Sequence, residues 1–166
     1  ILCRFPLLFL NTHEEDRWES ELATLALDME RGIVIWTATD GAAPALDGQT
    51  GDHRTAADFL QQITAYPRDH VFLLKDFHPF LKDPFVVRRL RDVIPKLTEQ
   101  NKTILMMGPD SEVPVELQRD AVSLELPLPG LEDLREELRE LLIQRQPALH
   151  LLLHLALLLL LRLLLV

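Results

Sequence analysis

The segment VFLLKDFH, residues 71–78, decides the fold class, because four apolar residues run directly into Lys75 and Asp76. A short apolar run of this kind is typical of a strand buried on both faces of a parallel sheet. In α/β proteins the binding residues follow the carboxyl ends of such strands. A carboxylate at this place can hold magnesium in nucleotide hydrolases, so Asp76 is the first candidate site residue.

Working outward from this strand, similar apolar runs alternate with segments of helical pattern. The other predicted strands are 5–10, 33–38, 103–107 and 122–129, and the predicted helices are 15–30, 55–65, one that begins at Pro84, and 131–145. We expect Pro95 to kink or end the third helix. Glycines and a proline predict a long loop over 39–51. The order predicts an α/β fold of three layers, with a five-stranded parallel sheet and helices on both faces.

Composition narrows the classes of partner. The chain has 166 residues, a formal net charge of −9 and one cysteine. An acidic chain has no general attraction for nucleic acid, so we expect none as a partner. A single cysteine excludes an internal disulfide and fits a reducing compartment such as the cytoplasm. No secretory signal is recognised at the N-terminus.

The C-terminal end differs from the rest, so we divide the chain into an α/β domain, 1–146, and a leucine-rich tail, 147–166. The tail is interpreted as a very apolar packing helix, as a membrane span, or as leucine standing in for unassigned residues. Arg162 within the run argues against a simple span. We therefore favour the packing helix or the stand-in, and we expect no membrane partner unless the tail is a genuine membrane element.

The segment after the first predicted strand tests for a phosphate site. A phosphate-binding loop needs glycines, a lysine and a Ser or Thr, but NTHEEDRW, residues 11–18, has neither glycine nor lysine. The carboxylates of Glu14, Glu15 and Asp16 suit the positive end of a helix and would repel a triphosphate. Phe77 stands where a hydrolytic site would hold a Glu. We therefore expect no catalytic residue and no metal site, and Asp76 either caps a loop or holds a metal through water.

Three arginines form the other candidate feature. Arg88, Arg89 and Arg91 make a local basic patch on the predicted third helix. Such a patch is typical of a solvated helix face, and it can also bind an acidic partner. The three arginines are therefore candidate partner-binding residues.

Several of these segments resemble one family. VFLLKDFHPFLKDPFVVRRLRDV, KTILMMGPDSEVPVEL and LELPLPGLEDL are similar to the degenerate N-terminal AAA-like domain of the chloroplast and cyanobacterial conserved-reading-frame (ycf-type) AAA-family ATPases. The resemblance covers about residues 5–145, and KDFHPFL is its most specific part. It implies a P-loop-like fold that lacks the phosphate loop.

The resemblance also implies roles for residues and partners. LLKDF corresponds to the Walker B strand, with Asp76 retained, and Arg119 falls near the arginine-finger position. Both are weak candidates for contact with nucleotide. ATP and magnesium would bind to a second AAA module, and this chain would need no cofactor. The implied partners are that module or other subunits of a homo-oligomer, in the cytoplasm or in a plastid stroma.

Three functional hypotheses follow. The first is a non-catalytic domain that acts in assembly or partner binding. The second is a regulatory domain that binds nucleotide or metal weakly through Asp76. The third is a stand-alone receiver-like signalling domain, against which Asn11 and Thr12 count because a receiver needs acidic residues at that place.

Overall fold

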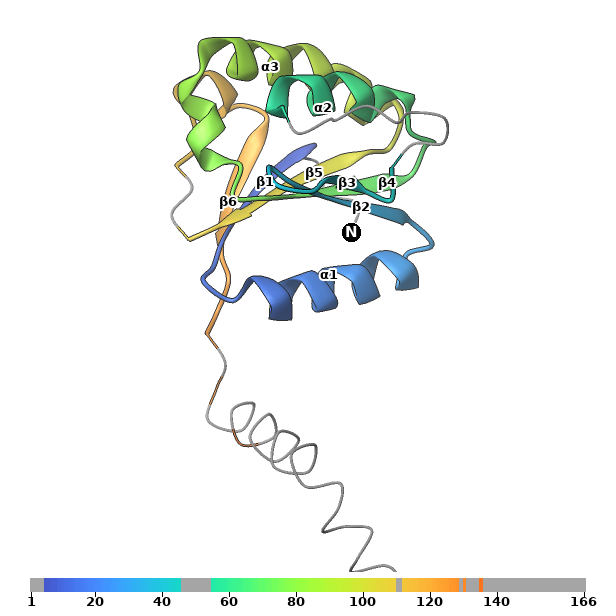
Figure 1. Ribbon diagram of the computed structural model, residues 1–166, viewed down its shortest axis with the longest axis vertical. Coiled ribbons are helices and arrows are strands. Elements are labelled where there is room, and N and C mark those ends of the chain that lie inside the picture. The colour runs from blue at the N-terminus through green and yellow to red at the C-terminus, as the bar shows by residue number, and fades with distance from the viewer. Residues whose placement is uncertain (1–4, 46–54, 110–111, 129, 131–134, 136–166) are drawn as a thin grey trace, which may run out of the picture. The chain divides into compact units, whose positions relative to one another are not determined.

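The computed structural model describes residues 5–45, 55–109, 112–128, 130 and 135. They form one six-stranded sheet in the order β3-β2-β4-β5-β1-β6, with helices on both faces (Figure 1). The strands are β1 (Leu7–Asn11), β2 (Gly32–Thr37), β3 (Gly41–Ala43), β4 (His70–Lys75), β5 (Thr103–Gly108) and β6 (Ala121–Glu125). The predicted α/β class is confirmed.

The parallel strands lie in an order that excludes one hypothesis. β1 pairs with β5 on one side and with β6 on the other, and β2 lies beyond β4. In receiver-like and flavodoxin-like sheets the first strand lies between the second and third parallel strands. The prediction of a receiver-like domain is therefore wrong for this chain.

The predicted number of strands is also wrong, because the segment predicted as a loop contributes a sixth strand. β3 pairs antiparallel with β2 at the edge of the sheet. In the turn between them, Thr37 and Thr39 donate hydrogen bonds to the Asp40 carboxylate at 3.1 and 2.9 Å. A three-residue strand of small residues carries no apolar pattern, so it cannot be recognised from the sequence alone. Residues 46–51 of the predicted loop lie outside the described residues.

The described α-helices lie on both faces of the sheet (Figure 1). α2 (Ala56–Gln62), which continues into a 3₁₀ turn at Ile63–Ala65, and α3 (Pro84–Glu99) lie over the larger apolar cluster. α1 (Glu15–Asp28) lies over a smaller cluster. The two clusters are separate because successive residues of a strand point to opposite faces.

The start and course of α3 follow from its sequence. The Asp83 carboxylate accepts a hydrogen bond from the Phe85 backbone N–H at 2.8 Å, and Pro84 occupies the first turn. Of the two effects expected at Pro95, an end of the helix is wrong, because α3 continues to Glu99. Its inner stripe is fully apolar and consists of Val86, Val87, Leu90, Val93, Ile94 and Leu97.

The predictions for the C-terminal part of the chain fall outside the described residues. They concern the helix over 131–145, of which Arg135 alone is described, and the tail 147–166. Among the residues that the structure describes, no helix is long and apolar enough to cross a membrane.

Candidate functional site

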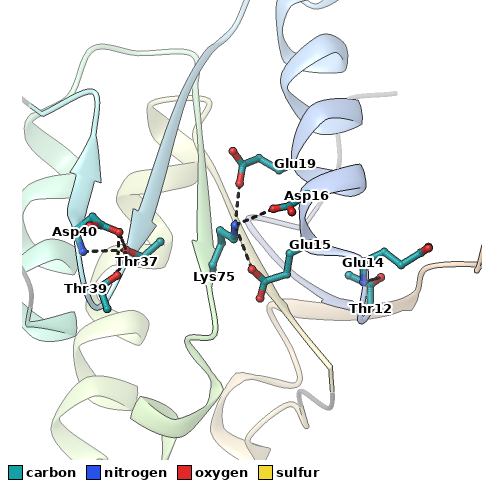
Figure 2. Close-up of polar contacts among 9 residues, drawn as sticks. All are labelled: Thr12, Glu14, Glu15, Asp16, Glu19, Thr37, Thr39, Asp40 and Lys75. Atoms are coloured by element: carbon teal, nitrogen blue, oxygen red, sulfur yellow. Dashed lines mark hydrogen bonds and ion pairs between the residues drawn. The ribbon is translucent and has the colours of Figure 1, made fainter. Parts of the chain in front are cut away.

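The candidate site lies at the edge where the parallel strands end. The segment Thr12–Glu14 leaves β1 for α1, and Lys75 and Asp76 close β4. Figure 2 shows Lys75 directed toward the first two turns of α1. The two segments are about sixty positions apart in the sequence, and the parallel sheet brings their ends to the same edge.

Lys75 is the centre of an ion cluster. Its Nζ lies 2.9 Å from Glu19 Oε2 and 3.1 Å from Glu15 Oε2, and Asp16 Oδ1 is 4.0 Å away (Figure 2). Glu15 and Glu19 are four residues apart, so both carboxylates face the sheet from one side of α1. The Lys75 side chain is 16% exposed, whereas that of Asp16 is fully exposed. The cluster therefore rests on two carboxylates and one lysine.

The charge state of Lys75 reflects these neighbours. Burial alone would lower the pKa of Lys75, but hydrogen bonds to Glu19 and Glu15 and the charges of these carboxylates outweigh it. The pKa is therefore raised above its ordinary value, and Lys75 stays an ammonium group at neutral pH. An ammonium group that two protein carboxylates already neutralise is a poor ligand for a phosphate.

The residues before α1 are also engaged within the protein. Thr12 is buried, and its Oγ1 accepts a hydrogen bond from the Glu14 backbone N–H at 3.0 Å. The Glu14 carboxylate pairs with Arg17 Nη1 at 3.1 Å. An anion-binding helix start offers free backbone N–H groups and a positive field. In this chain the Glu14 N–H already has an acceptor, and carboxylates at the helix start offset the positive field of the helix.

Asp76, the first candidate, does not join this cluster. Its side chain is exposed, and no hydrogen bond or ion pair to the carboxylate occurs within the described part of the chain. Its backbone is left-handed, with φ of 50°, and its N–H donates to the Met107 carbonyl at 2.9 Å. The Lys75 side chain at the end of β4 therefore contacts the start of α1, whereas the Asp76 side chain does not. The fully buried Phe77 follows, where a hydrolytic site would hold a Glu.

Arg119 lies far from Asp76 in the fold. It is exposed in the segment between the 3₁₀ turn Val115–Leu117 and β6. This segment precedes β6, so Arg119 lies where the parallel strands begin. Asp76 follows β4 and therefore lies where the parallel strands end, on the opposite side of the sheet. The structure does not bring these two candidates together within one chain.

The three arginines of α3 are exposed, as a solvated or partner-binding face requires. Arg88 Nη2 pairs with Asp92 Oδ1 at 2.7 Å across one helical turn. Arg88 and Arg91 line a hollow of about 230 Å³ beside Lys82. The Phe85 side chain is 81% exposed at the start of the same helix. Partner binding by these arginines stays a prediction.

Lys75 is the residue that sequence reasoning missed. It was noted as part of a strand end, but Glu15 and Glu19 were not recognised as its partners. The available signal was a lone cation at the end of an apolar strand and carboxylates at the start of a helix that follows another strand.

Among the described residues, no group of three His, Cys, Asp or Glu side chains could hold a metal ion.

Comparison with known proteins finds relatives over most of the chain. Residues 1–126 match the family of SpoVK-like AAA ATPase N-terminal domains. The AAA domain-containing protein ycf46 of Trieres chinensis is 32% identical over 142 residues, which cover 83% of this chain and 28% of that protein. The protein of the same name from Guillardia theta is 30% identical over 138 residues, or 81% of this chain and 27% of that protein. The chain thus spans less than a third of these relatives.

Proposed function

Because this chain belongs to the family of SpoVK-like AAA ATPase N-terminal domains, we propose that it is a non-catalytic domain of an AAA-family ATPase that acts in assembly or partner binding. ATP and magnesium are bound by a second AAA module of the longer protein. The proposed partners are that module and other subunits of a homo-oligomer. We propose no cofactor and no nucleic-acid partner for this domain, and a cytoplasmic or plastid-stromal location.

The Lys75 cluster is the observation that carries the proposal. In a phosphate-binding α/β domain, the start of the helix after the first strand receives the phosphates through free N–H groups. In this chain Glu15 and Glu19 stand at that helix start, bound to Lys75. A nucleotide would have to break two ion pairs and then lie against the released carboxylates. This supports a P-loop-like fold whose phosphate loop is lost.

The same cluster supports a structural use for the former site. Lys75 ends β4 and its two carboxylate partners belong to α1, so the ion pairs join the helix to the sheet. A helix fixed to the sheet in this way gives a rigid surface. A partner that binds to a rigid surface loses less binding free energy to the ordering of flexible side chains.

Partner binding through α3 is part of the proposal. Phe85 and Val115 are 81% and 78% exposed and are the apolar side chains that a partner would cover here. Lys82, Arg88 and Arg91 border the hollow between the start of α3 and the Val115–Leu117 turn. Apolar anchors beside arginines are common at protein interfaces.

Phosphate release from ATP tests the absence of catalysis. The whole chain and its Asp76→Ala variant are purified in the same way and assayed with magnesium and ATP. We expect both rates to equal the background without protein, because the sequence has no phosphate-binding loop and Phe77, not a Glu, follows Asp76. A rate above background that Asp76→Ala abolishes would refute the proposal. The variant is the control for a contaminating ATPase, which would appear equally in both preparations.

A further inference from the structure

The outer face of α3 is basic in a chain that is acidic overall. Arg88, Arg89, Arg91 and Lys96 are exposed on this helix, and of these four only Arg88 has an ion-pair partner among the described residues, namely Asp92. The formal net charge of the chain is −9. Two copies therefore repel each other at long range, and the outer face of α3 is a surface that attracts an acidic one.

The outer face of α1 carries charge of the opposite sign. Asp16, Glu21 and Asp28 are exposed, whereas no lysine or arginine is exposed along this helix, all of which is described. The carboxylates that pair with Lys75 face the sheet, so they do not belong to the outer face. Three exposed carboxylates without a neighbouring exposed cation make this face acidic.

Each outer face also exposes a large apolar side chain. Leu27 of α1 is 76% exposed and does not line the apolar groove of about 270 Å³ that lies between the sheet side of α1 and the strands β1 and β6. Phe85 is exposed at the start of α3. Protein interfaces combine buried apolar side chains with a polar rim. Each face thus supplies an apolar side chain together with charges of one sign.

The two outer faces cannot meet within one copy of the chain. α1 and α3 pack on different apolar clusters, on opposite faces of the sheet (Figure 1). A contact between the two faces therefore joins α3 of one copy to α1 of another. Such a heterologous contact leaves one face of each kind free, so that copies add head to tail until a ring closes.

The charges on the two helices have the same spacing. Glu21 and Asp28 are seven residues apart, and so are Arg89 and Lys96. Seven residues make about two helical turns, or about 10.5 Å, so each pair lies along one side of its helix. α1 has 14 residues and α3 has 16, so the helices are also of similar length. Two such helices side by side can form both ion pairs at once.

We propose that the outer face of α3 binds the outer face of α1 of a second copy of this chain. The inference rests on the proposed function in that it names the surfaces and the partner for the assembly role. Exposed ion pairs each contribute little and are screened by salt. The association of this domain is therefore weak and is strongest at low salt.

Sedimentation equilibrium of the whole chain tests the proposal. We expect the average mass to rise with protein concentration at low salt and to fall toward that of the monomer at about 1 M salt, where the screening length is about 3 Å. Glu21→Arg combined with Asp28→Arg makes the α1 face basic. Arg89→Glu combined with Lys96→Glu makes the α3 face acidic. Each double variant alone should associate at least about tenfold more weakly than the wild type, because two attractions become repulsions.

A mixture of the two double variants is the sharpest step. The unchanged α3 face of the first variant meets the unchanged α1 face of the second, and the two reversed faces also attract each other. We therefore expect the equimolar mixture to associate about as strongly as the wild type. Arg119→Glu is the control, because it reverses an exposed charge in the segment before β6, outside both faces, and should leave the association unchanged.

Milder substitutions keep the test valid if a charge reversal unfolds the chain, which circular dichroism detects. Glu21→Gln combined with Asp28→Asn, and Arg89→Gln combined with Lys96→Gln, remove the same charges and nearly preserve side-chain size. Each pair should weaken the association at low salt and reduce its dependence on salt.

Four results would overturn the proposal. They are a wild-type chain that stays monomeric at low salt, a mixture no more associated than its components, association that is equal in all variants and unaffected by salt, and association that the α3 variant loses but the α1 variant retains. The last result would assign the α3 face to another acidic segment. No nucleotide is present, so failure here leaves the proposed absence of catalysis intact.

Discussion

The face of the sheet beneath α2 and α3 and the face beneath α1 share the same strands but are stabilised differently. On the first face α3 buries six apolar side chains, and the rings of Trp36, Phe59, Phe72 and Phe77 contact one another. On the second face α1 buries Ala26 alone, and ion pairs with Lys75 join it to the sheet. One face is closed by apolar packing, whereas the other combines polar contacts with an apolar groove.

The difference shows where the domain has room for function. An apolar core that is fully buried on one face fixes the fold and leaves nothing to bind. The α1 face retains exposed leucines and buried donors without partners among the described residues, and the ends of β1 and β4 beside it carry the Lys75 ion cluster. The Lys75 ion cluster therefore adjoins α1, the described helix with the least apolar burial, whereas the exposed arginines lie on the outer side of α3.

The two tryptophans give the largest expected contrast between the faces. Trp36→Ala should lower the free energy of unfolding by about 3–5 kcal/mol, because it leaves a cavity in a fully buried cluster. Trp18→Ala should cost only about 1–2 kcal/mol, because this half-buried side chain already borders an open groove. Urea unfolding followed by far-ultraviolet circular dichroism measures both. Equal losses would show that the two faces are equally well packed.

Lys75→Met should have a smaller effect, about 1 kcal/mol of unfolding free energy, because it keeps the apolar stem but removes two partly exposed ion pairs. The raised pKa of Lys75 sets the pH dependence. Because the pKa is raised in the folded state, charged Lys75 contributes its full stabilisation at pH values below 10.5, the ordinary pKa of lysine. This stabilisation is lost as the pH rises through the raised folded-state pKa. The difference between wild type and variant should thus be constant from about pH 7 to 9 and shrink above about pH 10.5.

Lys82→Met is the matched control for this prediction. Lys82 is exposed and forms no ion pair among the described residues, so its replacement should change the unfolding free energy by less than about 0.5 kcal/mol at any pH. A difference in unfolding free energy between wild type and Lys75→Met that persists at high pH would mean that the aliphatic part of the side chain, and not its charge, accounts for the effect.

The parallel strands and helices of the described part could be read from the sequence because each is a continuous apolar run or a helical stripe between clear breaks. β3 could not, since Gly41–Ala43 has no pattern of its own and forms only by pairing with β2. The sequence left open whether α3 ends at Pro95, and the helix continues past it. At that position the lost backbone hydrogen bond is offset by the buried stripe on both sides of the proline.

The candidate site was predicted in part. The sequence indicated the correct edge of the sheet and the carboxylates at the start of α1. It did not indicate that β4 would direct Lys75 toward α1 and leave Asp76 exposed, because this depends on the twist of the strand end and on the left-handed backbone of Asp76. Nor could it show the groove, which exists only where α1, β1 and β6 meet in space.

Binding of a fluorescent ATP analogue, in the presence of magnesium, to the whole chain is the most direct test of the proposal that this domain binds no nucleotide. Because Glu15 and Glu19 neutralise Lys75 and face the place of the phosphates, we expect no saturable change in anisotropy even at near-millimolar protein. Saturable binding would contradict this account, and its loss in Asp76→Ala would place a nucleotide-sensing site at the end of β4.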